Sequence, residues 1–544
     1  NAAALDNQGR YPEALRLYGA LVKQFPANAQ LLENYADVLF RAGRLRECLN
    51  AFNRSLALGN EQARLYCNRG IALRKLDRPQ QAVESYDRAI ALNPGLAVAH
   101  YNRANALLEL RRFAEDVTSF DAALLRHPAY AEAYHNRGVS LKELGRFQEA
   151  LDSYDRAVAL QPDHAEAYCN RGVVLKELDR YREALHSYDR AIAVRPGYAS
   201  AYCNRGSVLQ ELEQFGEAVA CYQIAITNDP DLVETYWNLA LLHLLTGNYR
   251  EGWALYEWRF KHKSLNIPLR AYAETRYSGQ AVKDKTVLLY AEQGLGDTLQ
   301  FCRYAGLLAD RGARVILEAQ PVLASLLETL DARIEVLPAG SKIPGFDYYS
   351  PLLSLPYLFK TGLDTIPAAP AYLRADPGKS GAWRRRLGEK RLPRVGLVWS
   401  GSMEHKQDHK RSIPLASFAG MLNLPFEFHC LQQEIREDDL SFCRNRANLK
   451  LHDPLLTDFA ETAALAEQMD LVISVDTAVA HLAGALGKPL WLLLPFIPDF
   501  RWLLERGDTP WYPSATLFRQ DASRDWSAVL GRMILSLRAW PFER

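Results

Sequence analysis

The chain has 544 residues, of which 48% are hydrophobic and 24% charged, so we expect three or four packed domains and exclude a disordered protein. The formal net charge of +1 gives no global attraction to nucleic acid or to an anionic membrane. No apolar run reaches the roughly 20 residues that a membrane-spanning helix needs, so neither a nucleic-acid partner nor membrane insertion is expected.

The first half of the chain repeats with a period of 34 residues. In the frame Ala131–Pro162, the small residues Gly138 and Ala150 let two helices approach closely, and Tyr154 fills the gap beside them. Pro162 ends the second helix. This pattern resembles the tetratricopeptide (TPR) repeat over residues 1–262, a helical hairpin that stacks into a superhelix. It predicts an α-solenoid whose full repeats start at residues 29, 63, 97, 131, 165, 199 and 233. At the small position of its repeat, Asp116 is expected to weaken packing locally.

An asparagine recurs at the same position of seven successive repeats, beginning at Asn34. Its side chain offers a donor and an acceptor, so the column can pair with the backbone of an extended peptide whatever the peptide's sequence. Alternatively, the column stabilises the stack, because asparagine inside a helix needs a partner or exposure. The similarity to the arm of protein O-GlcNAc transferases favours the first interpretation. The predicted acceptor-binding residues are Asn68, Asn102, Asn136, Asn170, Asn204 and Asn238.

After residue 262 the pattern changes. The aromatic segment 252–260 is expected to pack the arm against the C-terminal half of the chain, and residues 263–283 to form a connector. Short β-rich runs alternating with helices then predict an α/β region of two Rossmann-like domains, 284–375 and 393–520, with a linker at 376–392 and a C-terminal helix within 521–544. Such sheets bind ligands at the carboxyl ends of their strands. The expected strands are Val287–Ala291, Val315–Ala319, Ile334–Leu337, Phe346–Tyr349, Val395–Trp399, Phe426–Leu431, Leu449–Leu451, Leu471–Val475 and Leu490–Leu494.

A glycine-containing turn comes after the first of these strands. Gly294 and Gly296 bring bare backbone near a ligand and free the N-terminus of the next helix. The spacing is not GxGxxG, so a dinucleotide site is not expected. Asp297 is either a carboxylate that only favours the helix dipole or a general base that faces the cleft.

Two further turns carry polar residues at strand ends. Asp476 follows the strand Leu471–Val475 and suits sugar hydroxyls, while Thr477 opens a helix whose amides can hold a phosphate. His481, one turn later, is a structural residue or a ligand. The Trp399–Gly401 turn is followed by the cations Lys410 and Arg411, which are either solvated or bind phosphate; we favour phosphate because of the turn beside them.

These motifs together carry a resemblance to a known family. Gly294–Asp297 with Ser474–Ala485 resembles the ADP-heptose lipopolysaccharide heptosyltransferases, inverting and metal-independent enzymes of the GT-B fold, over residues 284–520. Trp399–Ser402 with His405, Asp408–Leu415 and Pro510–Pro513 resembles the TPR-linked bacterial glycosyltransferases, which include flagellin-modifying ones. The resemblance implies that Asp297 is the catalytic base. It implies donor binding by Gly294, Gly296, Ser400, Gly401, Lys410, Arg411, Asp476, Thr477 and His481.

The remaining polar groups give little support for a metal. There is no Asp-x-Asp motif after a strand, and the run Glu434–Asp439 is expected to be a solvated helix face. Glu461 is either a site residue or a capping residue at a helix start. The eight cysteines form no CxxC pair, which predicts reduced, packed thiols in a cytoplasmic protein and no zinc site. We expect no cofactor, with a nucleotide-sugar as co-substrate.

The expected function is therefore an inverting, metal-independent transfer of a sugar from a nucleotide-sugar to a hydroxyl of an acceptor protein, flagellin being one candidate, held by the TPR arm. Two alternatives stay open. The acceptor is lipopolysaccharide or another glycan, or the chain is a non-catalytic TPR interaction protein with a degenerate α/β module.

Overall fold

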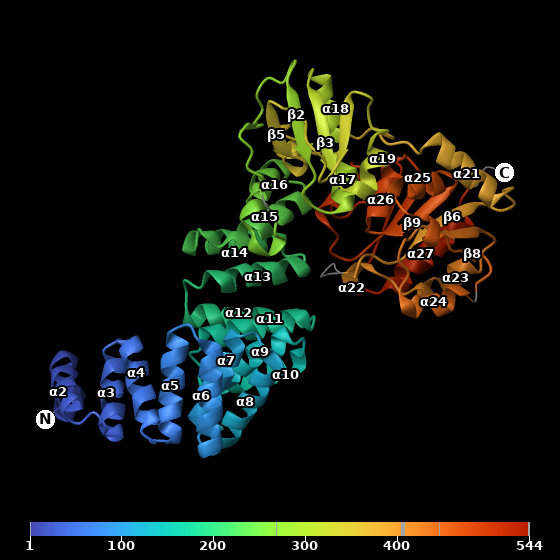
Figure 1. The fold of residues 1–544 in the computed structure, drawn as a ribbon. Helices are drawn as coiled ribbons and strands as arrows, with labels where there is room; N and C mark the ends of the chain where they lie inside the picture. Colours follow the sequence, from blue (N-terminus) through green and yellow to red (C-terminus); the bar gives the residue numbers. More distant parts are fainter. Residues whose placement is uncertain (1, 268, 404–407, 445, 542–544) are drawn as a thin grey trace. The chain divides into compact units, whose positions relative to one another are not determined.

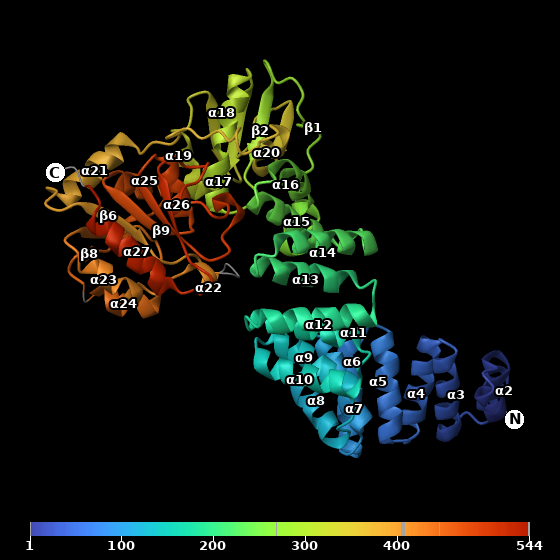
Figure 2. The same ribbon diagram turned by 180° about the vertical axis from the view of Figure 1, so that it is seen from behind.

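The computed structural model describes residues 2–267, 269–403, 408–444 and 446–541 (Figures 1 and 2). Contacts between residues divide the chain into two compact units, Asn1–Leu232, here called the arm unit, and Val233–Arg544, the body unit. The arm unit is helical in its regular structure, and the body unit combines helices with two parallel sheets. The predicted helical TPR solenoid followed by a parallel-sheet α/β region, consistent with a Rossmann-like fold, is confirmed at this level.

The arm unit is a stack of helical hairpins, each with a first helix A and a second helix B (Figure 1). Neighbouring A helices contact one another directly, which places them on the inner side of the stack's curve. The A helices are α1 Ala2–Asn7, α3 Ala29–Arg41, α5 Ala63–Lys75, α7 Ala97–Glu109, α9 Ala131–Glu143, α11 Ala165–Glu177 and α13 Ala199–Glu211. The B helices are α2 Tyr11–Gln24, α4 Leu45–Ala57, α6 Pro79–Leu92, α8 Phe113–Arg126, α10 Phe147–Leu160, α12 Tyr181–Val194 and α14 Phe215–Asn228.

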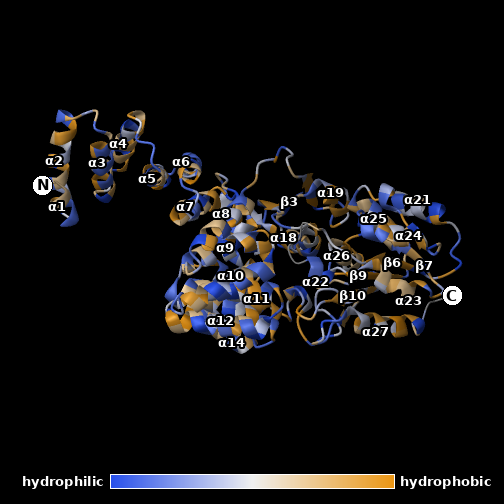
Figure 3. Cartoon of the chain, turned by 90° about the horizontal axis from the view of Figure 1, so that it is seen from below, coloured by the Kyte–Doolittle hydropathy of each residue, from blue (hydrophilic) through white to orange (hydrophobic). Residues whose placement is uncertain are grey.

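The close approach within a hairpin depends on glycine facing tyrosine. A Cβ atom on Gly138 would come within 2.8 Å of the Tyr154 ring, and one on Gly172 within 2.6 Å of the Tyr188 ring. Both tyrosines are completely buried. The arm's helices carry hydrophobic and hydrophilic residues along their length, as amphipathic helices do (Figure 3). The predicted pairing of a small residue with an aromatic one is therefore confirmed.

An arginine ladder joins the repeats. Each arginine of the ladder donates from Nε to an Asp or Asn on the B helix of the preceding repeat, at 2.6–2.8 Å. It also donates from Nη1 to a Ser or Cys on the B helix of its own repeat. One side chain thus connects three helices. This ladder was not predicted, although its members recur with the same 34-residue period as the repeats. Its members are Arg69, Arg103, Arg137, Arg171 and Arg205.

Asp116 interrupts the regular packing of the arm. It is completely buried on α8, and neither carboxylate oxygen has a hydrogen-bond partner among the described residues. The neighbouring Ser140 hydroxyl donates to the Asn136 carbonyl instead. Burial raises the pKa of Asp116 to about 7. A carboxyl group at this position, which a small residue occupies in other repeats, therefore lowers the stability of the stack locally.

The body unit contains two parallel sheets. The first has the order β1-β5-β2-β3-β4, and the second has the order β11-β10-β9-β6-β7-β8. In the first the strands are β1 Thr275–Arg276, β2 Thr286–Tyr290, β3 Arg314–Ala319, β4 Ile334–Pro338 and β5 Tyr348–Pro351. In the second they are β6 Arg394–Val398, β7 Glu427–Cys430, β8 Leu449–Lys450, β9 Leu471–Val475, β10 Leu490–Leu494 and β11 Ala515–Arg519. Nine strands were predicted, with ends displaced by at most two residues; β1 and β11 were not.

Helices cover these sheets, and the second sheet has a continuous apolar core that includes Leu397, Ile473 and Leu493, all completely buried. The predicted linker contains the helix α21 (Pro377–Leu387), whose Trp383 and Lys379 both donate to Glu461 on α25 (Phe459–Glu467). The helices are α17 Leu295–Phe301, α18 Arg303–Asp310, α19 Pro321–Leu327, α20 Leu355–Leu358, α21 Pro377–Leu387, α22 Asp408–Arg411, α23 Ala419–Leu422, α24 Glu437–Arg444, α25 Phe459–Glu467, α26 Ala478–Ala485 and α27 Trp526–Arg538.

The last helical hairpin, α15 Val233–Leu245 and α16 Tyr249–Tyr256, belongs to the body unit although its sequence continues the repeat. Trp253, 1% exposed, lies edge-on against Phe301 of α17 and against Phe500, with ring centroids 5.8 and 5.7 Å away. Tyr256 donates to the side chain of Gln293 at 3.1 Å. The sequence repeat and the compact unit therefore end at different residues.

Candidate functional site

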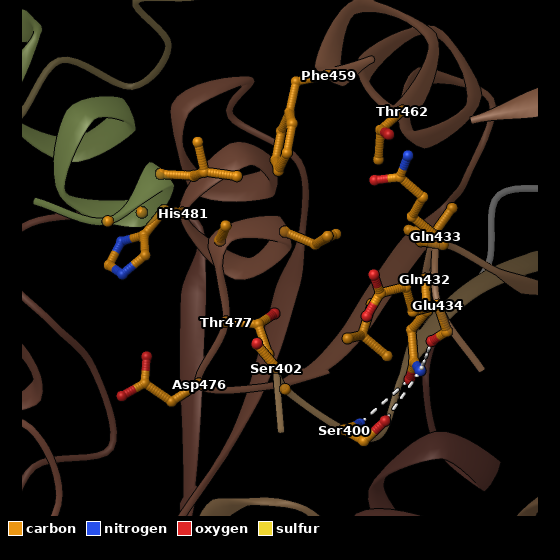
Figure 4. A pocket seen from close by; sticks show the side chains of 18 of the residues that line it. Ser400, Ser402, Gln432, Gln433, Glu434, Phe459, Thr462, Asp476, Thr477 and His481 are labelled. Atoms are coloured by element: carbon orange, nitrogen blue, oxygen red, sulfur yellow. Dashed lines mark hydrogen bonds between the residues drawn. The ribbon is translucent and has the colours of Figure 1, made fainter. Parts of the chain in front are cut away.

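A cleft of about 670 Å³ lies in the body unit, where strand ends of the second sheet face the turn after β2 and the helix α17 (Figure 4). Nine of the ten residues predicted for catalysis and donor binding line it. Lys410 is half-buried beside Arg411 on α22 and is not among the cleft-lining residues of the described chain. The nine are Gly294, Gly296, Asp297, Ser400, Gly401, Arg411, Asp476, Thr477 and His481.

Asp297 lies in the first turn of α17. Its Oδ2 accepts the backbone N–H of Gly294 at 3.0 Å, and its Oδ1 pairs with the guanidinium of Arg501. The side chain thus caps the helix and also lines the cleft, so the two interpretations of Asp297 are compatible. Burial raises its pKa above the usual aspartate value, and Arg501 acts in the opposite direction. The result is a half-buried carboxylate whose charged form is stabilised by Arg501 and by backbone N–H groups.

Gly296 allows α17 to approach α26. A Cβ atom at this position would lie 2.7 Å from the Cδ2 atom of His481, so any side chain would displace that ring. His481 is itself fixed, because its Nδ1 is hydrogen-bonded to the Tyr512 hydroxyl at 2.9 Å and its ring stacks on Trp502. Burial, reinforced by Arg501, lowers its pKa well below the usual histidine value. His481 is therefore a neutral, well-packed imidazole in the cleft wall.

The turn from β9 to α26 combines a carboxylate with a helix N-terminus. Thr477 is the N-cap of α26, and the amides of Ala478 and Val479 in the first turn have no partner within the helix. Arg411 donates from Nη1 to the Asp476 carbonyl at 2.9 Å, which places a cation beside these amides. Burial, followed by the nearby Asp499, raises the pKa of Asp476 to about 6. An anion and a sugar hydroxyl both find suitable partners here.

The side chain of Gln432, which follows β7, holds the Trp399–Gly401 turn in place. Gln432 accepts the backbone N–H groups of Trp399 and Ser400 at 2.6 and 3.1 Å, and donates to the Ser400 hydroxyl at 3.0 Å (Figure 4). In Figure 4, Gln432 and Glu434 lie on the side of the cleft opposite His481 and Asp476.

Gly401 leaves room for an ionic cluster. A Cβ atom here would lie 2.5 Å from Asp408 and 2.6 Å from Arg411. Although burial acts to raise it, hydrogen bonds from Ser412, Arg411 and Arg436 hold the pKa of Asp408 below its usual value. The cluster orients Arg411 toward α26. His405, part of the same sequence motif, lies outside the described residues.

Several cleft residues were not predicted. Asp499 and Arg501 follow β10, and Gln433 and Glu434 follow β7. The signal that could have found them is their place after parallel strands of the same sheet, whose carboxyl ends share one edge. On α25, Phe459 and Thr462 also line the cleft, and no motif marks them.

Two expectations about acidic residues are resolved by contacts. The run Glu434–Asp439 was predicted to be a solvated helix face, but the helix α24 begins only at Glu437, and Asp439 is 7% exposed. It accepts the indole N–H of Trp399 at 2.8 Å and the Leu415 amide at 3.0 Å, because these buried donors need an acceptor. Glu461 does not line the cleft of the described chain and binds α21 instead; Asp458 caps α25 by accepting the Glu461 amide at 2.7 Å.

In the arm unit, three asparagines of the recurring column, here called the asparagine ladder, bond to the preceding repeat. Asn68 donates to Asp37 at 3.2 Å, and Asn136 donates to Asn105 at 2.9 Å. Asn204 donates to the Cys169 thiol at 3.6 Å. These bonds are the ones that the stack-stabilising interpretation requires, and they use the amide nitrogen rather than the carbonyl oxygen. Acceptor binding by the ladder stays a prediction.

The cysteines of the chain are packed thiols. All eight are free and buried, in agreement with the prediction. The described residues include no group of three or more His, Cys, Asp or Glu placed to hold a metal ion. Within them, no helix has both the length and the apolar character to cross a membrane.

Comparisons with known families agree with both halves of this description. Residues 455–493 match the family of glycosyltransferase family 9 (heptosyltransferase), a segment that includes α25, β9 and α26. Models of the tetratricopeptide repeat match residues 7–66, 63–96, 129–197, 169–230 and 203–257.

Among curated proteins, the chain is similar to protein FlbA of Caulobacter vibrioides, with 28% identity over 327 residues. The match covers 55% of this chain and 54% of FlbA, so the chain spans about half the length of this relative. Among solved structures, YrrB, described as a TPR protein with an unusual peptide-binding site, is 26% identical with a TM-score of 0.32, covering 34% of this chain and 96% of YrrB. MamA is 22% identical with a TM-score of 0.29, covering 30% of this chain and 94% of MamA. The chain thus carries TPR repeats in its N-terminal region and a glycosyltransferase family 9 match in its C-terminal region.

Proposed function

We propose that the protein is an inverting, metal-independent glycosyltransferase of the GT-B type that transfers a sugar from a nucleotide-sugar to a hydroxyl of a protein held by the arm. The observation that carries the proposal is the placement of Asp297 and the β9–α26 turn in one cleft. Asp297 supplies a half-buried carboxylate, and the turn supplies helix amides beside a cation. The family 9 match includes this second turn.

The donor fits the wall formed by β9, α26 and the Trp399–Gly401 turn. The diphosphate would lie at the N-terminus of α26, where amides and Arg411 favour negative charge. Asp476 would accept hydroxyls of the sugar. Because His481 is neutral, it can hydrogen-bond a sugar hydroxyl without adding charge.

The reaction follows from these positions. Asp297 takes the proton of the acceptor hydroxyl while that oxygen forms a bond to the anomeric carbon. The bond from the anomeric carbon to the phosphate oxygen breaks on the opposite face, and the nucleoside diphosphate leaves with the electron pair, so the configuration inverts. The α26 amides and Arg411 then stabilise the charge on the leaving group.

The acceptor is proposed to be a polypeptide because the TPR repeats indicate a protein partner. Ladder asparagines that already use their amide nitrogen on the preceding repeat keep a carbonyl oxygen that can accept a peptide N–H. A glycan acceptor is the second candidate; the cleft chemistry is the same, and only the use of the arm differs.

The test is nucleotide-sugar binding to the intact chain, measured by native mass spectrometry and calorimetry with EDTA present. We expect one member of a nucleotide-sugar panel to bind, and Arg411→Ala to weaken that binding by about tenfold, as loss of a charge-assisted contact predicts. The exposed Arg385 on α21 provides the matched control, since Arg385→Ala removes an arginine away from the cleft. Binding that strictly requires Mg²⁺ would refute the metal-independent mechanism, and failure of every donor to bind would refute the function.

A further inference from the structure

Arg501 is the arginine that contacts Asp297, and nothing in its local sequence marks it. It belongs to the short 3₁₀ turn Phe500–Trp502 after β10, and its side chain is 10% exposed. Nη2 pairs with Oδ1 of Asp297, and Nη1 pairs with Asp499 at 2.8 Å. Nε donates to the side-chain oxygen of Gln300 at 2.5 Å. Three acceptors, two of them on α17, therefore use all three nitrogen atoms of the guanidinium.

The surroundings hold this guanidinium in place. It lies 4.4 Å from the ring centroid of Phe500 and 5.7 Å from that of Phe301. Trp253 of α16 packs edge-on against both of these rings. From the other side, Arg519 donates to the carbonyl of Trp502, which fixes the backbone next to Arg501. A rigid side chain of this kind is suited to orienting a neighbour rather than to following a mobile ligand.

Asp297 needs such a neighbour. Burial favours its protonated form, and the nearby Asp499 acts in the same direction, whereas Arg501 favours the carboxylate. A protonated Asp297 cannot accept the proton of an acceptor hydroxyl. The carboxylate keeps free lone pairs even with its two present hydrogen bonds, because each oxygen can accept more than one.

We propose that Arg501 is a positioning residue for the general base: it orients Asp297 and keeps it ionised, and it does not serve as a ligand of the donor phosphate. This inference rests on the proposed function, in which Asp297 is the base. It assigns the two cleft arginines different tasks. Arg411 lies beside the α26 amides where the diphosphate would bind, while the guanidinium of Arg501 is already engaged by Asp297, Asp499 and Gln300.

The experiment compares Arg501→Gln and Arg501→Lys with the wild type in the full chain. The measurements are kcat/KM for transfer between pH 5 and 9, donor affinity by calorimetry, and the thermal midpoint. For Arg501→Gln we expect a 10–100-fold loss of kcat/KM at pH 7, with donor affinity within about twofold of the wild type. The acid limb of the pH profile, where kcat/KM falls as Asp297 is protonated, should be displaced upward by about one pH unit. Arg501→Lys restores part of the activity and moves the limb back, because it keeps the charge. The charged and titratable groups around Asp297 in the cleft are Arg501, Asp499, Asp476, His481, Tyr256 and Arg411.

Asp297→Asn supplies the second arm of the experiment. In the double variant Asp297→Asn/Arg501→Gln the loss should be no greater than in Asp297→Asn alone, because Arg501 acts through Asp297. An unmoved acid limb together with a lowered thermal midpoint would overturn the proposal in favour of a structural role. A tenfold or larger loss of donor affinity would overturn it in favour of a phosphate ligand. Absence of transfer by the wild type with every donor would refute the proposed function itself, and this inference with it.

Discussion

Arg137 in the arm unit and Arg501 in the body unit form similar contacts with different consequences. Arg137 is 19% exposed and bonds Asp121 and Ser153, both at 2.6 Å. Arg501 also joins an aspartate and a polar side chain, and adds a second aspartate. The first arrangement recurs at five positions of the arm, whereas the second is built once, from segments 204 residues apart. In the arm, stability is spread over many equivalent contacts. In the body, the contacts around Asp297 occur only once.

The largest effect is expected where a single group does the chemistry. Asp297→Asn should lower kcat by about 10²–10⁴-fold, the usual cost of losing a general base, with donor affinity and the thermal midpoint largely kept. Asp376 gives a matched control: it caps α21 by accepting the Lys379 amide at 2.8 Å, and it is not among the described cleft residues. Asp376→Asn should therefore leave transfer unchanged. Near-normal turnover of Asp297→Asn would remove Asp297 from the mechanism.

The next prediction compares the loss of a buried aromatic residue in the body with the loss of one in the repeated arm. Trp253→Ala should destabilise the body unit by about 3–5 kcal/mol, since a buried aromatic is lost from the contacts to α17 and Phe500. Hydrogen exchange followed by mass spectrometry should show faster exchange in α17 and in the 500–502 turn. Tyr188→Ala, at a completely buried aromatic of the arm, should increase exchange only in neighbouring repeats. The same pattern from both variants would contradict the division into two units.

The arm offers a site where a substitution should stabilise. Asp116→Ala restores a small residue and should raise arm stability by about 1–3 kcal/mol at pH 8, the cost of a buried group without a partner. The sign follows from the raised pKa of about 7 in the folded arm. Below about pH 4 both states are protonated; as pH rises to 7 the unfolded state ionises first, and the folded arm loses stability.

The gain from Asp116→Ala should therefore grow between pH 4 and pH 7 and then level off, which thermal unfolding at a series of pH values will show. Asp163→Ala, at an exposed position of the arm, is the control and should show no such dependence. A gain that does not change with pH would mean that packing, rather than the buried charge, sets the cost.

The smallest effects distinguish the two interpretations of the asparagine ladder. Asn136 donates to Asn105, whereas Asn170 forms no side-chain hydrogen bond within the described chain. Asn136→Ala should thus lower arm stability by about 0.5–1.5 kcal/mol, and Asn170→Ala should leave it unchanged. If the asparagine ladder binds the acceptor, both variants raise the KM for a protein acceptor to a similar extent. An unchanged KM in both would leave the ladder only a role in the stack.

The arm was predictable from the sequence because its contacts repeat at the period of the chain. Gly138 and Tyr154 identify the hairpin, and the same spacing locates every other repeat. In the body, apolar runs such as Leu471–Val475 are visible as strands, whereas β1 has only two residues and β11 alternates too weakly to stand out. Asp476 and Asp297 were found because each follows a strand within a motif.

Arg501 and Asp439 could not be found in this way. Arg501 acts on a residue of a different sheet region, and only the folded chain brings the two together. Asp439 lies in a run of charged residues that looks solvated, and its burial is determined by the indole of Trp399 on the facing segment. Long-range partners of single polar residues have no local signature, so sequence patterns show the scaffold and part of the cleft but not the contacts that adjust its chemistry.

The assignment of α15 and α16 to the body unit has a consequence for how such a chain can change length. The body carries a helical hairpin of its own, which keeps α17 packed through Trp253. Whole 34-residue modules can then be added or removed before Val233 while the described residues that line the cleft, all of them in the body unit, stay in place. Under the proposed function, the number of arm repeats and the residues of the cleft would then be free to evolve separately.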